Sequence, residues 1–372
     1  MLRVLHVIGV MDRAGAESLI MNLYRAINRS KIQFDFLVHE TREGDFDEEI
    51  RSLGGAIYRI PRLNGVNGLA YRMRCREFFV SHPEHTIIHG HIGSSAGIYL
   101  SEAKKAGRFT IAHSHSQDFL PGIPGVAFKL LTHSTRRIAD YFMACSIEAG
   151  RDRFGERIVN GDRFHVLNNG IDVRQYRCNA EEHEDAKRLL GYEGVPLFGH
   201  VGRLAPEKNH RFLFETFCQI LHELPDAKLL LAGRGPLENE LKALAAKMGI
   251  ADAIDFAGVR SDVPTLLKAM DAFIFPSIKE GLALAVVEAQ ACGLPCVVSE
   301  GVPDLAIISS RTQRLPLSAG AKMWKDAALA AYQDSLRLPR RDDIGSVVEH
   351  GFDIATTARW LSEFYEQAAR KA

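Results

Sequence analysis

Short apolar runs alternate with stretches of helical composition along the whole chain. Strands that alternate with helices are typical of a parallel sheet, and 372 residues are enough for two domains, each with its own core. The runs with strand character fall at residues 4–8, 34–38, 56–60, 86–89, 109–112, 141–144, 164–167, 197–201, 228–232, 254–256, 272–275 and 296–299. The sequence therefore predicts an α/β fold with parallel sheets.

The boundary between the two domains is predicted in residues 172–195, a polar and charged stretch without a strong apolar period. This places an N-terminal domain at 1–178 and a C-terminal domain at 179–350. Apolar residues recur with a helical period after residue 351, so 351–372 is predicted as a terminal helix. Residues 309–343 give no clear pattern.

The charge of the chain is balanced overall and divided unevenly. Residues 1–180 carry 24 Lys and Arg against 19 Asp and Glu, while the whole chain has 46 of each kind. An excess of five is too small to indicate nucleic-acid binding, and spaced arginines are usually solvated. Peripheral contact of the basic N-terminal domain with a membrane surface is left open, since each cation near an anionic leaflet contributes roughly 1 kcal/mol.

Composition also bears on the compartment. No apolar window reaches the ~18 residues of a membrane span, and the first ten residues do not have the pattern of a signal peptide. The six cysteines show no CxxC or metal-finger spacing, which favours free buried thiols. We expect a cytoplasmic protein, with a location at the inner face of the cytoplasmic membrane left open.

Two carboxylates eight residues apart, Glu280 and Glu288, lie where a loop is predicted to enter a helix. The buried run 272–275 ends at Pro276, and residues 284–291 have helical composition. At the carboxyl edge of a parallel sheet, ligands bind at such loops and helix N-termini. Glutamates on one helix are more often only solvated, so this pair alone does not establish a site.

A cation pair supplies a second motif in an equivalent place. Arg203 and Lys208 follow the strand candidate 197–201 and precede a helical pattern. Arg203 offers a planar donor fork and Lys208 a point charge, a combination suited to a diphosphate. Isolated surface cations would be unremarkable.

Five motifs in order complete a signature: Asn169-Gly-Ile-Asp172, Gly202-Arg-Leu-Ala-Pro-Glu-Lys-Asn209, Gly233-Arg-Gly-Pro236, Phe256-Ala-Gly-Val259 and the glutamate pair. Together they resemble the retaining glycosyltransferases of family GT4, over nearly the whole chain and most closely the branch that builds capsular and extracellular polysaccharides. The resemblance implies the GT-B fold, in which two doubly wound domains face each other across a cleft. It also implies a terminal helix that returns to the first domain, with Trp360 and Phe364 as its anchors.

In the second domain the resemblance implies a donor site. Arg203 and Lys208 match the pair that grips the donor diphosphate, and Glu288 matches the carboxylate that accepts the ribose hydroxyls. Glu280 matches the carboxylate beside the transferred sugar. The remaining donor-binding candidates are Gly233, Val259, Arg260, Gly281, Leu282, Ala283 and Leu284, together with Gly15 of the first domain. Ala283 stands where many relatives have proline or glycine.

In the first domain the resemblance implies the acceptor side and a catalytic histidine. Ala14-Gly15 stands where many relatives carry two glycines, and Gly15 allows close approach to a phosphate. Two histidine pairs end probable strands, and the segment after the fifth strand favours His115, with His113 as its competitor. The acceptor-side candidates are Ala14, His89, His91 and Ser146.

The histidine spacing also suits a metal, because residues i and i+2 of a strand share a face. No cysteine or acidic cluster completes a site and the family is generally metal-independent, so we expect neither a metal nor a cofactor. The resulting hypothesis is a retaining glycosyltransferase that moves a sugar from a nucleoside diphosphate sugar, such as a UDP-sugar, to a hydroxyl of a polysaccharide or lipid-linked saccharide by front-face displacement. The alternatives are a UDP-sugar 2-epimerase-type isomerase of the same fold and a non-catalytic sugar-nucleotide-binding subunit.

Overall fold

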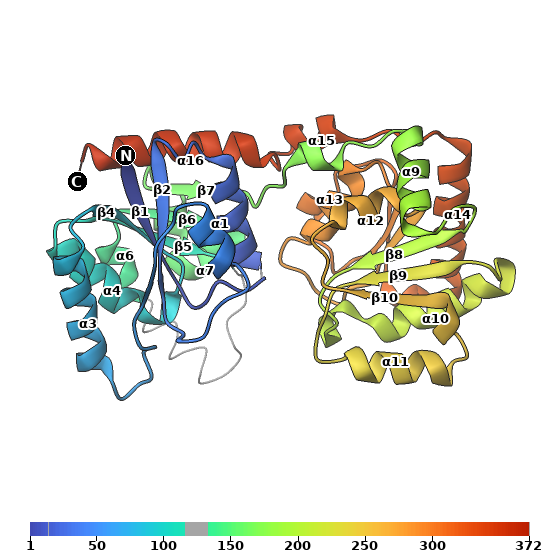
Figure 1. The fold of residues 1–372 in the computed structure, drawn as a ribbon, viewed down its shortest axis with the longest axis horizontal. Helices are drawn as coiled ribbons and strands as arrows, with labels where there is room; N and C mark the ends of the chain where they lie inside the picture. Colours follow the sequence, from blue (N-terminus) through green and yellow to red (C-terminus); the bar gives the residue numbers. More distant parts are fainter. Residues whose placement is uncertain (14, 116–132, 372) are drawn as a thin grey trace. The chain divides into compact units, whose positions relative to one another are not determined.

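The computed structural model describes residues 1–13, 15–115 and 133–371 (Figure 1). The chain forms two compact units, one of Met1–Gly170 with Ile354–Ala372 and one of Ile171–Asp353. The first crossing comes before the expected limit at 178, because Tyr176 and Cys178 are buried in the core of the second unit. The second crossing comes after the expected limit at 350, because Phe352 is buried in the same core.

The first unit contains a seven-stranded sheet in the order β3-β2-β1-β4-β5-β6-β7, with every pair parallel. Its strands are β1 Leu2–Ile8, β2 Ile32–Val38, β3 Ile57–Arg59, β4 His85–Gly90, β5 Phe109–Ser114, β6 Tyr141–Ala144 and β7 Phe164–Val166. Its helices are α1 Gly15–Ala26, α2 Asp47–Ser52, α3 Gly68–Ser81, α4 Gly93–Lys105, α6 Thr135–Ile138, α7 Ile147–Phe154, α8 Glu156–Val159 and α16 Ile354–Ala369. All seven strands predicted in this half of the sequence are present.

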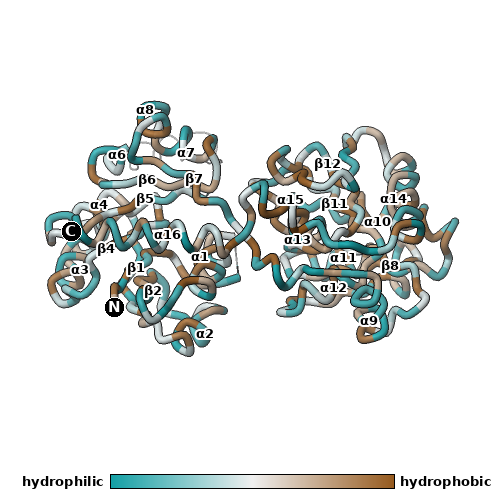
Figure 2. The backbone as a smooth tube through the Cα atoms, turned by 90° about the horizontal axis from the view of Figure 1, so that it is seen from above, coloured by the Kyte–Doolittle hydropathy of each residue, from teal (hydrophilic) through white to brown (hydrophobic). Residues whose placement is uncertain are grey.

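Alternate residues of each strand point to opposite faces, and both faces of the first sheet are covered. On one face α16 lies beside α1 and packs against β4 (Figure 1). Leu361 and Tyr365 are fully buried residues of α16, whereas Trp360 and Phe364 are half-buried. Trp360 stacks on His165, and the Phe364 ring contacts the Tyr141 ring at a tilt of 51°. Hydrophilic and hydrophobic residues accordingly alternate along this helix (Figure 2).

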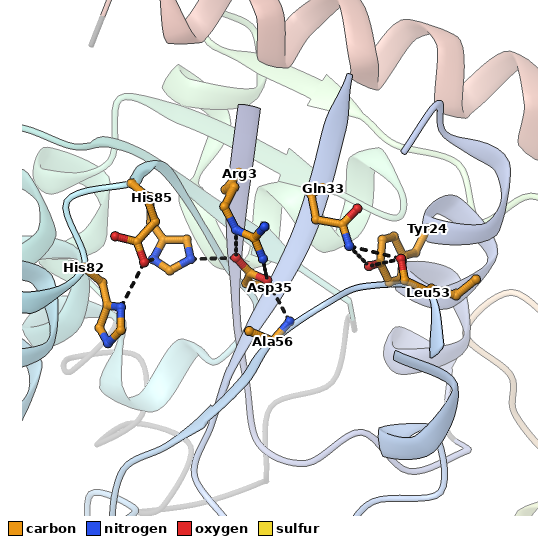
Figure 3. Close-up of polar contacts among 9 residues, drawn as sticks. Arg3, Tyr24, Gln33, Asp35, Leu53, Ala56, His82 and His85 are labelled. Carbon is orange, nitrogen blue, oxygen red and sulfur yellow. Dashed lines mark hydrogen bonds and ion pairs between the residues drawn. The ribbon is translucent and has the colours of Figure 1, made fainter. Parts of the chain in front are cut away.

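A buried ion pair fixes the amino-terminal side of the first sheet (Figure 3). The carboxylate of Asp35, on β2, accepts hydrogen bonds from Arg3 on β1 at 2.5 and 2.6 Å. It also accepts from the Ala56 amide at 2.7 Å and lies 2.8 Å from Nε2 of His85 on β4. One carboxylate therefore joins three neighbouring strands and the segment before β3.

The second unit contains a six-stranded parallel sheet in the order β10-β9-β8-β11-β12-β13. Its strands are β8 Leu197–Val201, β9 Lys228–Ala232, β10 Ile254–Gly258, β11 Ala272–Phe275, β12 Cys296–Ser299 and β13 Thr312–Leu315. Its helices are α9 Ala180–Leu190, α10 His210–Glu223, α11 Glu238–Lys247, α12 Val263–Ala269, α13 Leu284–Ala291, α14 Gly320–Arg337 and α15 Ile344–Glu349. Helices α9, α12, α13 and α15 cover one face, and α10, α11 and α14 the other.

The domain boundary predicted within residues 172–195 lies instead at Gly170–Ile171. This segment belongs to the second unit and contains α9, which begins with a capping box between Asn179 and Glu182. The helix is held by a buried ion pair of 2.8 Å between Lys187 and Asp271 rather than by a broad apolar face. The prediction relied on an apolar period to recognise helices, whereas α9 is marked by its capping box and its buried ion pair.

Among the described residues, no helix combines the length and the apolar character that crossing a bilayer requires.

Candidate functional site

In each sheet the strand order reverses once, between β1 and β4 in the first and between β8 and β11 in the second. The loops that leave the carboxyl ends of these strands diverge to opposite faces, which makes the reversal a ligand-binding position in open α/β sheets. The predicted site residues lie at these two edges.

At the edge of the second sheet, Lys208 and Glu280 form an ion pair. Lys208 follows β8 and Glu280 follows β11, and their Nζ and Oε1 atoms are 2.7 Å apart. Both side chains are largely buried, at 16% and 10% exposure, and the ammonium lies 4.8 Å from the centroid of the Phe275 ring. The structure therefore brings together two predicted residues that are 72 positions apart and fixes the cation in place.

Arg203 lies on the same loop as Lys208 and is exposed, and no described carboxylate is paired with it. The loop is tied to its neighbour by the Ile278 amide, which donates to the Glu207 carbonyl at 2.7 Å. It ends at Asn209, which has a left-handed backbone (φ 56°) immediately before α10. The constrained loop thus carries one exposed guanidinium and one largely buried, paired ammonium.

Glu288 is the fifth residue of α13 and is partly buried. Its Oε1 accepts a hydrogen bond from the Tyr176 hydroxyl at 2.8 Å. Burial raises the pKa of Glu288 to about 7, although the Tyr176 hydroxyl opposes the shift. The carboxyl group is therefore poised between its acceptor-only ionised form and a protonated form near neutral pH.

Gly233 and Gly235 pack against the loop after β8. A Cβ atom at Gly233, where φ is 140°, would lie 1.9 Å from the Gly202 carbonyl oxygen. One at Gly235 would lie 2.2 Å from the Leu204 carbonyl oxygen. These glycines thus allow the two backbones to approach closely, and this contact fixes the Arg203 loop. Contact of Gly233 with a nucleotide stays a prediction.

The two residues predicted to read the base follow β10. Val259 is half exposed, and Arg260 forms an ion pair with Asp262 at 2.5 Å. In the loop predicted to contact the sugar, Gly281 is exposed, Leu282 and Leu284 are half-buried and Ala283 is buried. Ala283 adopts a left-handed conformation with φ 58°, an uncommon choice for alanine. This strained residue turns the chain from Glu280 into α13.

At the edge of the first sheet, five histidines gather on the face covered by α16. His6, His89 and His113 come from β1, β4 and β5, and His91 and His115 follow β4 and β5. Contacts between ring nitrogens join His6 to His91 at 2.9 Å, His91 to His115 at 2.7 Å and His89 to His113 at 3.1 Å. The Tyr365 hydroxyl of α16 lies 2.5 Å from Nδ1 of His89.

Burial keeps these imidazoles neutral. It lowers the pKa of His6 to about 3 and that of His115 to about 4, and it lowers the pKa of His89, His91 and His113 well below the ordinary value. Only His91 and His115 retain partial exposure. Of the two competitors, His115 is thus the more accessible one, while His113 is buried.

Neutral imidazoles are also metal ligands, and two triads, His6/His89/His91 and His91/His113/His115, have nitrogens within 4.8 Å of one another. The observed separations of 2.7–3.1 Å are hydrogen-bond distances. Two ligands of one tetrahedral zinc, with bonds of about 2.0–2.1 Å, would lie about 3.3 Å apart. The present arrangement fits a hydrogen-bonded network better than a metal centre.

The remaining first-unit candidates occupy helix ends. Gly15 begins α1, and a Cβ there would meet nothing within 4 Å. Ser146 caps α7, where its Oγ accepts from the Ala149 amide at 3.1 Å. Ala14 lies outside the described residues. The geometry gives Ser146 a capping function, and its contact with an acceptor stays a prediction.

Three contributors were not identified in the sequence: His6, Tyr176 and Tyr365. His6 shares strand parity with Val4 and Ile8, so the alternation of the first strand could have indicated that it faces the same side as the histidine pairs. Tyr176 contacts Glu288, 112 residues away in the sequence, and Tyr365 contacts His89, 276 residues away. No local pattern reports contacts of that range.

The chain is similar to known glycosyltransferases along its whole length. The family model described as "Glycosyltransferase Family 4" matches residues 13–175, and the one described as "Glycosyl transferases group 1" matches residues 181–318. EpsF of Bacillus subtilis strain 168, whose name assigns it provisionally to the glycosyltransferases, is 31% identical over 99% of this chain and 97% of its own length. The UDP-Gal:alpha-D-GlcNAc-diphosphoundecaprenol alpha-1,3-galactosyltransferase of Escherichia coli is 34% identical over 39% of this chain and 38% of its own length.

Solved structures agree on the fold. Anabaena HepE in complex with UDP superposes with a TM-score of 0.78 at 17% identity, covering 99% of this chain and 100% of HepE. WaaG, a glycosyltransferase involved in lipopolysaccharide biosynthesis, superposes with a TM-score of 0.66 at 14% identity, over 97% of this chain and 95% of WaaG. Two doubly wound parallel sheets with this topology make up the GT-B fold. The chain therefore belongs to glycosyltransferase family 4 and is a hexosyltransferase.

Proposed function

We propose that the enzyme transfers a hexose, with retention of anomeric configuration, from a UDP-sugar to a hydroxyl of a growing polysaccharide or lipid-linked saccharide. The observation that carries this proposal is the Lys208–Glu280 pair at the strand reversal of the second sheet. A cation fixed beside a carboxylate suits a ligand that joins a phosphate to a sugar. The name of the E. coli relative includes a UDP-sugar donor, which supports the choice of base.

In this proposal the second unit holds the donor. Arg203 and Lys208 bind the diphosphate and stabilise the charge that develops on it as the sugar departs. Glu280 accepts hydrogen bonds from hydroxyls of the transferred sugar, and Glu288 accepts them from the ribose. Because no carboxylate is placed as an obvious nucleophile, the departing phosphate would take the acceptor proton in a front-face displacement.

The acceptor is assigned to the first unit. A pocket of about 200 Å³ opens at the carboxyl ends of β1, β2 and β4, beside the N-terminus of α4. Its lining is mixed, with His39, Glu40, Arg62 and Ser94 among its polar residues. Such a lining offers both donors and acceptors to saccharide hydroxyls. Ala14, His89 and His91 stay acceptor-side proposals.

Peripheral contact with an anionic membrane is the second part of the proposal, and α3 supplies the surface. Leu69, Met73 and Val80 are 61–79% exposed and occupy one stripe of the helix, while its opposite side is buried in the core. Arg72 and Arg76, both exposed, border this stripe on one side, and the exposed Glu77 borders it on the other. An apolar stripe with flanking arginines suits a helix that lies in the plane of a lipid surface.

The membrane contact is tested by sedimentation with vesicles of phosphatidylcholine alone or with added phosphatidylserine. We expect binding to the anionic vesicles only, and its loss when Leu69, Met73 and Val80 are all replaced by serine. Leu189→Ser with Leu336→Ser, at exposed positions of the second unit, is the control and should bind as the wild type does. Equal binding by the triple variant would refute the surface.

Transfer is tested with a panel of UDP-sugars and saccharide acceptors. Lys208→Ala should reduce turnover at limiting donor at least tenfold, whereas Lys247→Ala, an exposed lysine of α11, should not. NMR of the product should show the anomeric configuration of the donor. Conversion of the donor without any acceptor would instead support an isomerase, and an inverted product would contradict retention.

A further inference from the structure

The five clustered histidines of the first unit form two separate hydrogen-bonded chains. In one, Nδ1 of His6 contacts Nε2 of His91, and Nδ1 of His91 contacts Nε2 of His115. In the other, the Tyr365 hydroxyl contacts His89, which contacts His113. Only the first chain ends at a partly exposed imidazole, His115, at the carboxyl edge of the sheet.

A neutral imidazole carries one N–H and one lone pair, so the protons of a three-imidazole chain must all point the same way. Either His6 donates to His91 and His91 to His115, or both hydrogen bonds run in reverse. In the first case His115 keeps its proton on Nδ1. In the second case it keeps its proton on Nε2, within the chain.

His6, at the buried end of the row of three imidazoles, decides between these two directions. Nε2 of His6 is buried and has no hydrogen-bond partner among the described residues, and the ring lies 4.2 Å from that of Phe34. In the reverse direction this nitrogen would carry an N–H without an acceptor. Buried unpaired N–H groups are rarer in native proteins than unpaired acceptors, and each unpaired buried group costs roughly 1–3 kcal/mol. The forward direction leaves only a lone pair there.

We propose that His6 and His91 are positioning residues that hold His115 as the Nδ1–H tautomer, so that His115 presents a hydrogen-bond donor, and not a base, at the carboxyl edge of the first sheet. Nδ1 of His115 has no partner among the described residues. The donor would serve a hydroxyl or phosphate oxygen of the bound substrates. That use rests on the proposed function, whereas the tautomer itself does not.

The tautomer can be measured without any substrate. Long-range nitrogen–proton correlation spectra of protein labelled in its histidines separate Nδ1–H from Nε2–H rings, and loss of one signal in His115→Gln assigns His115. We expect Nδ1–H in the wild type and a mixture of tautomers in His91→Leu. Tyr365→Phe is the matched control, because it alters only the other chain and should leave His115 unchanged.

Three results would overturn the proposal: His115 as Nε2–H, His115 doubly protonated at pH 7, or a shift of its signals after dialysis against a chelator, which would indicate a bound metal.

Kinetics supply the second readout. His91→Leu should lower kcat roughly tenfold, the scale of one lost hydrogen bond, with unchanged UDP affinity. His91→Asn, which keeps an N–H near the Nδ1 position, should recover most of it. If no variant and no wild type transfers sugar, the proposed function fails while the spectra still decide the tautomer.

Discussion

The carboxyl group of Glu288 makes donor binding depend on pH. Its pKa is raised to about 7, and only the ionised form accepts two hydrogen bonds from a ribose. UDP affinity should therefore rise about tenfold between pH 6 and pH 8, as the ionised fraction grows. Calorimetry across this range measures it. The terminal phosphate of UDP also ionises in this pH range. Glu288→Gln is the control, because only the phosphate contributes to the pH dependence of its UDP affinity. An equal change of affinity with pH in both proteins would contradict the assignment.

A second residue-scale prediction concerns Gly233. In Gly233→Ala the new methyl group would meet the Gly202 carbonyl at 1.9 Å with φ at 140°, so the loop after β8 must move. We expect a loss of at least about 3 kcal/mol in the free energy of unfolding, measured with urea. Gly281→Ala, where a Cβ meets nothing within 4 Å, should stay within about 0.5 kcal/mol of the wild type. Equal losses in the two variants would refute this account of the loop.

Site residues were predictable where a charged side chain comes soon after a predicted buried strand. Arg203, Lys208, Glu280 and Glu288 follow buried strands, and the sequence alone indicated them. That Lys208 pairs with Glu280 could not be predicted, because the adjacency of β8 and β11 depends on strand order. The same holds for the Tyr176 hydroxyl on Glu288.

At the scale of elements, Asp35 links the strands of the first sheet, and its removal should be costly. Burial alone would raise the pKa of Asp35, but hydrogen bonds from His85, Arg3 and the Ala56 amide outweigh it and lower the pKa. The stabilisation is present above the ordinary carboxyl pKa and is lost as pH falls through the lowered value. Asp35→Asn should cost about 3–5 kcal/mol at pH 7, because it leaves the Arg3 charge unpaired.

Urea unfolding at pH 7 and pH 3 measures this. The difference between Asp35→Asn and the wild type should shrink at pH 3, below the ordinary carboxyl pKa, because the unfolded chain then binds a proton at Asp35 more readily than the folded protein does. Asp152→Asn, an exposed position on α7, should change stability by less than about 0.5 kcal/mol at either pH. A difference that is the same at both pH values would contradict the ion-pair account.

The elements themselves were predictable in proportion to their apolar content. Strands β8, β9, β11 and β12 have the predicted bounds, because each is a continuous buried run. Strand β13, Thr-Gln-Arg-Leu, is the polar edge strand of its sheet and was missed. Helix α9 was missed although Asn179 and Glu182 form a capping-box pair that the sequence displays. Capping, not apolar period, was the available signal.

At the scale of the whole molecule, the chain crosses between the units twice, at Gly170–Ile171 and at Asp353–Ile354. Ile171 and Asp353 form a bridge, so the two crossings lie side by side. In the proposed reaction the donor binds one unit and the acceptor the other, so we expect turnover to require an approach of the two units. These crossings, and not residues 172–195, are the expected hinges. Small-angle scattering should show a smaller radius of gyration with saturating UDP; an unchanged value at saturation would count against closure.

Binding of UDP to the second unit tests the central claim most directly. Calorimetry at pH 8 should show one site in the wild type and in Glu240→Gln, an exposed carboxylate of α11 that serves as the control. Glu288→Gln should weaken UDP binding by about 1–3 kcal/mol, the scale of hydrogen bonds to a charged group. Unchanged affinity in Glu288→Gln, or no binding of UDP to the wild type, would contradict the account.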